Sequence, residues 1–139
     1  MPDYDQFLGT WRLLPDTCEY QQGDPPRAGT YVITEQQGLL HFKIAWTDAE
    51  GTAHEHEFSG PPNGQAEPFA GGDLADSLSI EVVSPRELNT TAFYQGRARM
   101  IAQRQLDETG GAMRLVQQIR FPDDTTLSNI SVYSRVVIN

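Results

Sequence analysis

The chain has 139 residues and a formal net charge of -9, from 10 lysines and arginines against 19 aspartates and glutamates. This length suits one domain, over residues 1–139, with a hydrophobic core of its own. The acidic balance repels phosphate backbones and anionic lipids, so we expect neither a nucleic acid nor a membrane as a partner.

The sequence also bears on the cellular compartment in which the protein is expected. The longest apolar runs are far shorter than the ~20 residues that cross a bilayer. Residues 1–9 lack the basic and apolar regions of a signal peptide. The one cysteine, Cys18, can form no intramolecular disulfide, which suits a reducing compartment. We therefore expect a cytoplasmic protein.

Apolar and polar residues alternate with a period of two along most of the chain, which is typical of strands with one buried face. The expected strands, in chain order, are residues 7–14, 29–36, 39–47, 52–60, 77–83, 87–94, 97–106, 112–120 and 125–138. No segment shows a sustained helical repeat. We expect an all-β protein, an antiparallel up-and-down β-barrel of about 8 to 10 strands.

The connections between these strands are mostly tight turns. Gln95-Gly96 fits a two-residue type I′ turn, and residues 48–51 and 122–124 each fit a type I turn that ends in a left-handed residue. Residues 15–29 and 60–76 are longer and rich in polar residues, Pro and Gly, so we expect loops there. The second loop fits either a lid over the barrel mouth or a surface excursion.

Motifs at the two ends of the chain resemble a known family. The stretch FLGTWRL, which contains Gly9 and Trp11, and the stretch VYSR, which ends at Arg135, resemble the calycin superfamily. Lipocalins and fatty-acid-binding proteins belong to this superfamily, and the similarity is greatest to small lipocalin-like bacterial domains. The resemblance implies that Trp11 packs beneath Arg135 and closes one end of a barrel. It implies no activity and no cofactor.

The first well-marked hairpin predicts which side chains point inward. If a type I turn with a bulge runs from Asp48 to Gly51, one face of the hairpin carries the pairs Trp46–His54, Ile44–His56 and Phe42–Phe58. The opposite face carries the charge pair Lys43–Glu57, which suits solvent. We therefore expect the aromatic face to line the interior.

The same reasoning applies to the last hairpin. It places Met113, Leu115, Gln117 and Ile119 on one face, beside Leu127, Asn129, Ser131, Tyr133 and Arg135. Because Arg135 has to reach Trp11, this face should be the inner one. The opposite face, with Val116, Ile130 and Val132, is nearly as apolar. It fits packing against a loop or a second subunit, so a monomer and a homodimer both remain open.

If both hairpins face inward as assigned, the barrel interior combines apolar walls with polar side chains. Polar side chains inside a barrel need hydrogen-bond partners. The favoured function is non-catalytic binding of a small hydrophobic or amphipathic molecule in the barrel cavity. The predicted ligand-binding residues are Phe42, Ile44, Trp46, His54, His56, Phe58, Leu115, Gln117, Asn129 and Tyr133. The alternative is a barrel filled by its own side chains, with a structural or interaction role.

A chemical role for the histidines is the other alternative. His54 and His56 would lie about 7 Å apart on one strand face, a spacing that metal sites use. The third histidine, His41, falls on the outer face, so a third ligand is missing. We expect no metal, haem or other cofactor and no catalytic residues. The alternative is a barrel enzyme, or a metal or haem site, that uses His54 and His56.

Overall fold

The computed structural model describes residues 4–21, 23–68 and 75–137. The strands are β1 (Gly9–Tyr20), β2 (Ala28–Gln36), β3 (Leu39–Thr47), β4 (Ala53–Gly60), β5 (Glu67–Pro68), β6 (Ser77–Ser84), β7 (Glu87–Tyr94), β8 (Arg97–Leu106), β9 (Ala112–Arg120) and β10 (Thr126–Arg135). One turn of 3₁₀ helix, η1 (Asp5–Phe7), precedes them.

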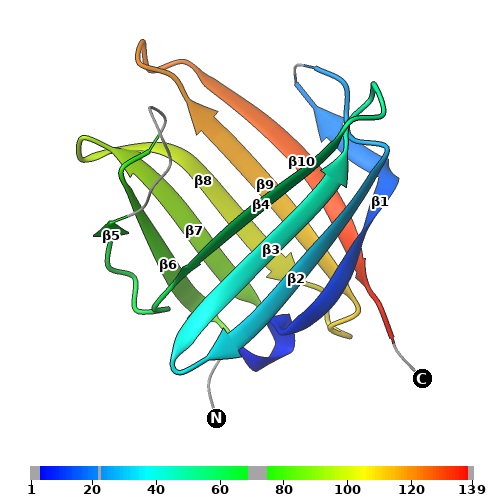
Figure 1. The fold of residues 1–139 in the computed structure, drawn as a ribbon, viewed down its shortest axis with the longest axis horizontal. Coiled ribbons are helices and arrows are strands. Elements are labelled where there is room, and N and C mark those ends of the chain that lie inside the picture. The colour runs from blue at the N-terminus through cyan, green and yellow to red at the C-terminus, as the bar shows by residue number, and fades with distance from the viewer. Residues whose placement is uncertain (1–3, 22, 69–74, 138–139) are drawn as a thin grey trace.

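The strands form one antiparallel sheet in the order β4-β3-β2-β1-β10-β9-β8-β7-β6-β5, which curls into a nearly closed barrel (Figure 1). The first and last long strands, β1 and β10, pair with each other and join the two halves of the chain. The predicted all-β, antiparallel up-and-down barrel is confirmed. No helix in the part of the chain described here is long and apolar enough to span a membrane.

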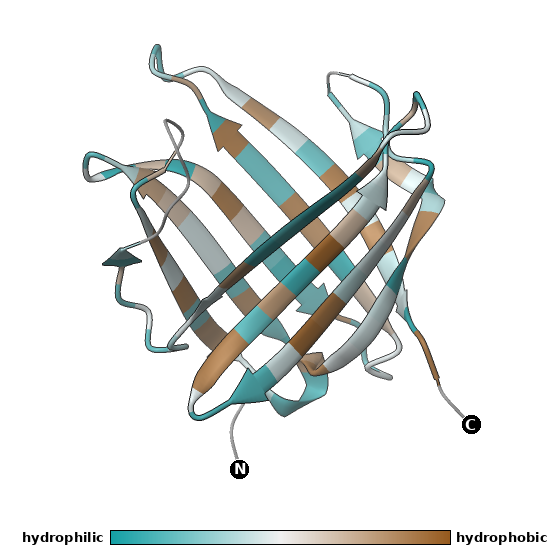
Figure 2. Ribbon diagram, viewed as in Figure 1, coloured by the Kyte–Doolittle hydropathy of each residue, from teal (hydrophilic) through white to brown (hydrophobic). Residues whose placement is uncertain are grey.

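Among the described residues, no ladder joins β4 to β6, and only a few residues of these two strands come close. β4 therefore has a full ladder only with β3. It is also the most exposed long strand, and it is coloured as hydrophilic along most of its length in Figure 2. Its charged side chains, Glu55 and Glu57, are the kind that discourage pairing of an open edge with another chain.

The turns adopt the predicted geometries. Gln95 and Gly96 both have positive φ, 51° and 81°, as a type I′ turn requires. Gly51 (φ 89°) and Asp124 (φ 68°) are the left-handed residues that end the β3–β4 and β9–β10 turns. The tight turns set the register of each hairpin, and so decide which side chains face inward.

The structure extends the first predicted strand and adds one strand. Residues 15–20 belong to β1, because an irregularity after Leu14 lets the chain pair with β10 again from Glu19 onward. The hydroxyl of Thr17 accepts the Val132 N–H at this point, so no backbone donor is lost. The predicted 60–76 loop contains the short strand β5, paired with β6. Residues 69–74 of this loop lie outside the described residues.

The end of the barrel near η1 is closed by the residues of the calycin-like motifs. The Arg135 guanidinium lies 4.3 Å from the centre of the Trp11 ring, as expected from the resemblance. It donates hydrogen bonds to the carbonyls of Leu8 (2.9 Å), Gly110 (3.1 Å) and Gln6. The Trp11 indole N–H donates to the Phe7 carbonyl at 3.0 Å, and both side chains are fully buried. This closed end lies at the bottom of Figure 1.

Candidate functional site

The registers of both predicted hairpins are confirmed. β3 and β4 pair Trp46 with His54, Ile44 with His56 and Phe42 with Phe58. β9 and β10 pair Leu115 with Ser131, Gln117 with Asn129 and Met113 with Tyr133. All ten predicted site residues therefore share the inner face of the barrel. His41 lies on the outer face, opposite Ser59, as expected.

Burial of the inward-facing side chains decreases from the closed end to the opposite end, which we call the mouth. Phe42, Leu115 and Tyr133 are buried in the core. The other inward-facing residues are only half-buried or exposed; these are Phe58, which lies opposite Phe42, and, nearer the mouth, Ile44, Trp46, His54, His56, Gln117 and Asn129. Solvent therefore reaches inward-facing side chains from the mouth, while the lower half is packed.

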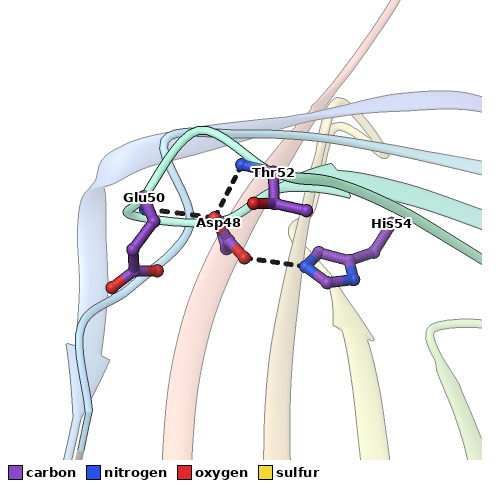
Figure 3. A network of polar contacts seen from close by, with 4 residues as sticks. All are labelled: Asp48, Glu50, Thr52 and His54. Atoms are coloured by element: carbon purple, nitrogen blue, oxygen red, sulfur yellow. Dashed lines mark hydrogen bonds and ion pairs between the residues drawn. The ribbon is translucent and has the colours of Figure 1, made fainter.

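A histidine and a carboxylate are paired at the rim of the mouth (Figure 3). His54 Nε2 lies 2.7 Å from Asp48 Oδ2, and the imidazole stacks on Trp46 with ring centres 5.2 Å apart. The other carboxylate oxygen of Asp48 accepts the N–H groups of Glu50 (3.0 Å) and Thr52 (2.8 Å). The hydrogen bond from His54, followed by those from the turn, holds the pKa of Asp48 below its usual range.

This pair fixes one imidazole at the mouth in a single orientation, where it can contact a bound molecule. The His54 side chain is 41% exposed, and the Asp48 side chain is also partly exposed. No cluster of three or more potential metal ligands occurs among the residues described. Because one ring nitrogen of His54 already bonds to Asp48, these two residues could offer a metal ion no more than two ligands.

The sequence analysis missed a buried arginine in the barrel interior. Arg104, on β8, is only 2% exposed and lies on the inner face, beside Leu115 of β9. Its Nε and Nη2 donate to the Tyr31 hydroxyl at 3.1 and 2.5 Å. Its Nη1 donates to the Thr90 hydroxyl at 3.1 Å. The guanidinium also lies 5.0 Å from the centre of the Phe42 ring.

All the contacts of Arg104 are with neutral groups. Its hydrogen-bond acceptors are hydroxyl and carbonyl oxygens, and no carboxylate among the described residues lies within ion-pair distance of it. A buried charge is costly without a counter-charge, even where its hydrogen bonds are satisfied. The interior therefore has an uncompensated positive charge below the half-open mouth.

Two tyrosines lie next to this charge. Tyr31 and Tyr133 pack edge to face, with ring centres 5.4 Å apart. Burial, together with the nearby Tyr31 hydroxyl, raises the pKa of Tyr133 far above its usual value, while the positive charge of Arg104 acts against this shift. Tyr133 is therefore a neutral phenol, so it does not supply the missing negative charge.

Higher in the interior, a polar atom is left without a partner. Asn129 Oδ1 is buried and accepts no hydrogen bond, whereas the neighbouring Gln117 donates through Nε2 to the Met100 sulfur at 3.1 Å. An amide oxygen in this position is free to accept a hydrogen bond from a bound molecule or from water.

Two hollows of the surface lie on the outer face of the barrel. One, of about 360 Å³, is lined by Val32, His41, Lys43 and Glu57 with their neighbours, over β2, β3 and β4. The other, of about 320 Å³, lies over the mouth ends of the same strands. Both are open to solvent. Their linings include some inward-facing positions, such as Phe42 in the first and His54 in the second, but neither includes Arg104 or Asn129, so we place the candidate site inside the barrel.

A signal for Arg104 is present in the sequence but it is ambiguous. The stretch RARMIAQRQL has arginines at both odd and even positions, and the ladder between β7 and β8 is irregular at Arg99. Ala102 and Leu106 share the parity of Arg104, whereas the other parity carries Gln103 and Gln105. Reading the strand backward from Leu106 would have placed Arg104 inside.

Comparison with known proteins supports the fold through structure and not through sequence. No family model and no curated protein sequence matches the chain. A Schistosoma mansoni fatty acid binding protein in complex with arachidonic acid is similar in structure, with 14% identity, coverage of 98% of this chain and 100% of that one, and a TM-score of 0.63.

Two further solved structures show the same architecture. The zebrafish ileal bile acid-binding protein complexed with cholic acid has 11% identity, covers 94% of this chain and 99% of its own, and has a TM-score of 0.54. The S-type phycobiliprotein lyase CPES from Guillardia theta has 8% identity, coverage of 98% and 92%, and a TM-score of 0.59. The chain thus shares the β-barrel fold of these proteins, as its terminal motifs predicted.

Proposed function

We propose that this barrel binds, without catalysis, a small amphipathic molecule that carries an anionic group. The observation that carries the proposal is Arg104, a buried guanidinium whose contacts are all with neutral groups. An anionic group that reaches Arg104 would supply the missing counter-charge in a region of low dielectric, where charge-assisted hydrogen bonds are strong.

The rest of the interior suits the remainder of such a molecule. Phe58, Ile44 and Trp46 form an apolar wall between the buried charge and the mouth. On the opposite wall, Asn129 offers an unpartnered amide oxygen. Two structural neighbours were solved with ligands that are acids, arachidonic and cholic acid, which agrees with this class of ligand.

The proposal is tested with dodecanoate and dodecanol, which share a chain length and differ in charge. Each is titrated against barrel-bound anilinonaphthalene sulfonate. The wild-type protein should prefer dodecanoate by about tenfold or more, because a hydrogen bond to a charged group contributes about 1.5–3 kcal/mol. Arg104→Met should remove this preference while dodecanol binding remains.

Arg12→Met is the matched control, because Arg12 is exposed on the outer face of β1. It should leave both affinities unchanged. Arg104→Met removes a buried charge, so we expect the variant to remain folded. Equal affinity of the wild-type protein for the two probes, or an unchanged preference in Arg104→Met, would contradict the proposal.

A further inference from the structure

The outer face of β1, β10 and β9 carries an apolar strip with charges at its corners. The strand registers place six side chains in two rows across these strands. One row is Leu14, Val132 and Arg114, and the other is Glu19, Ile130 and Val116. Leu14 is 38% exposed, and the three other aliphatic residues are half-buried.

The charges of this face differ from those of the rest of the molecule. β8, β9 and β10 contain no aspartate or glutamate, although the chain has 19 acidic residues. Arg114 and Arg120 on β9 are exposed. By contrast, β4 carries Glu55 and Glu57 on its outer face. Two copies with a charge of -9 each repel one another, and the repulsion is lowest where acidic residues are absent.

The two charged corners make the strip complementary to itself. Glu19 lies at one corner of the two rows and Arg114 at the diagonally opposite corner; Leu14 and Val116 occupy the other two. A two-fold rotation about the diagonal from Leu14 to Val116 brings Glu19 of each copy over Arg114 of the other. The aliphatic side chains then pack together at the centre, as an isologous interface requires.

We propose that the protein forms a homodimer through this β1–β10–β9 face, with reciprocal Glu19–Arg114 pairs on either side of an aliphatic centre. The rotation makes the strands of the two sheets cross at a steep angle, close to the orthogonal arrangement in which sheets pack. The mouths and the interiors stay free in this dimer, so the proposal is independent of ligand binding.

The irregularity in β1 decides which carboxylate lies at this corner. Without it, the chain after Leu14 would continue its pairing with β10, and the shorter carboxylate side chain of Asp16 would face Ile130. The extra residues between Leu14 and Glu19 bring the Glu19 carboxylate to the corner of the strip. Irregularities of this kind are used in sheets to re-aim a side chain.

The test is sedimentation velocity of the full chain across a concentration series, with four variants. The wild-type protein should dimerise. Val132→Lys should be monomeric, because it places a charge at the centre of the contact. Glu19→Arg and Arg114→Glu should each weaken the dimer by about tenfold or more through like-charge repulsion. The double variant Glu19→Arg/Arg114→Glu should recover most of the lost affinity.

Val83→Lys is the control, because Val83 is 50% exposed on β6, away from the proposed contact. It should dimerise like the wild-type protein. Circular dichroism checks that each variant is folded, and Val132→Thr, nearly the same size, replaces Val132→Lys if the latter unfolds. A wild-type monomer, a dimer that survives the Val132 variants, or no recovery in the double variant would overturn the proposal.

Discussion

Gly9 shows how one residue can close the end of a barrel. It has a φ of 134°, a conformation that side chains strongly disfavour, and a Cβ placed on it would lie 3.0 Å from Arg135 Nη1. A methyl group at residue 9 would therefore crowd the guanidinium where it lies over Trp11 and reaches the Leu8 carbonyl.

We expect Gly9→Ala to lower the free energy of unfolding by about 1–3 kcal/mol, through backbone strain and displacement of Arg135. Gly96→Ala is the matched control: its φ is 81°, and no heavy atom lies near the added Cβ. It should cost about 1 kcal/mol, from strain alone. Urea unfolding of the two variants compares these effects, and an equal loss would mean that the approach of Arg135 is unimportant.

At the same scale, the sequence predicted which residues of the β3–β4 hairpin face inward, and it missed Arg104, on which the proposed function depends. The register of β3 and β4 could be derived because an Asp-Ala-Glu-Gly turn fixes it and aromatic residues occupy a single face. Arg104 was missed because a buried arginine looks like an exposed one in a strand pattern. Its burial depends on Tyr31 and Thr90, which come from distant parts of the sequence.

At the scale of elements, three turns are each held by an aspartate. Asp48 accepts bonds in the β3–β4 turn, Asp107 in the β8–β9 turn and Asp123 in the β9–β10 turn. The pKa of each carboxyl is lowered, mainly by a side-chain hydrogen bond: from His54 to Asp48, from Thr109 to Asp107 and from Thr125 to Asp123.

These shifts predict a loss of stability in acid. A carboxyl whose folded pKa is depressed contributes its full stability above the unfolded pKa, near 3.9, and loses it as the pH falls through the lower folded value. The melting temperature should therefore fall as the pH drops below about 4. Asp48→Asn should reduce this acid-dependent part while lowering stability at neutral pH. A variant with the same pH profile as the wild-type protein would exclude a contribution from this turn.

Other elements could not be predicted because their cause is not local. β5 has two residues, and one of them is a proline, which disfavours a strand in sequence patterns. It pairs only because β6 lies at an edge of the curled sheet. The extension of β1 past Leu14 likewise depends on Thr17 reaching Val132. The rest of the barrel was predictable because each hairpin is closed by a recognisable turn.

At the scale of the whole molecule, the barrel is stabilised unequally around its circumference and along its axis. Around its circumference, β10 is paired on both sides, with a continuous ladder to β9 and an interrupted one to β1, whereas β4 has a ladder only with β3. Along its axis, the closed end is packed around Trp11, Phe7 and Met113, and the inward-facing residues near the mouth are partly exposed. The proposed route of a ligand lies in the less stable part of the molecule.

This inequality predicts a gradient in amide hydrogen exchange. Amides of β10 and of the closed-end half of β1 should exchange only through global unfolding, because their bonds lie in the packed core. Amides of β4 that point toward the gap should exchange much faster, through local opening or directly with solvent. Dodecanoate should slow exchange near the mouth in β3 and β4 and leave β10 unchanged. Hydrogen exchange measured by mass spectrometry with fragmentation distinguishes these strands. Equal protection of the β4 and β10 amides would show that the gap between β4 and β6 is closed in solution.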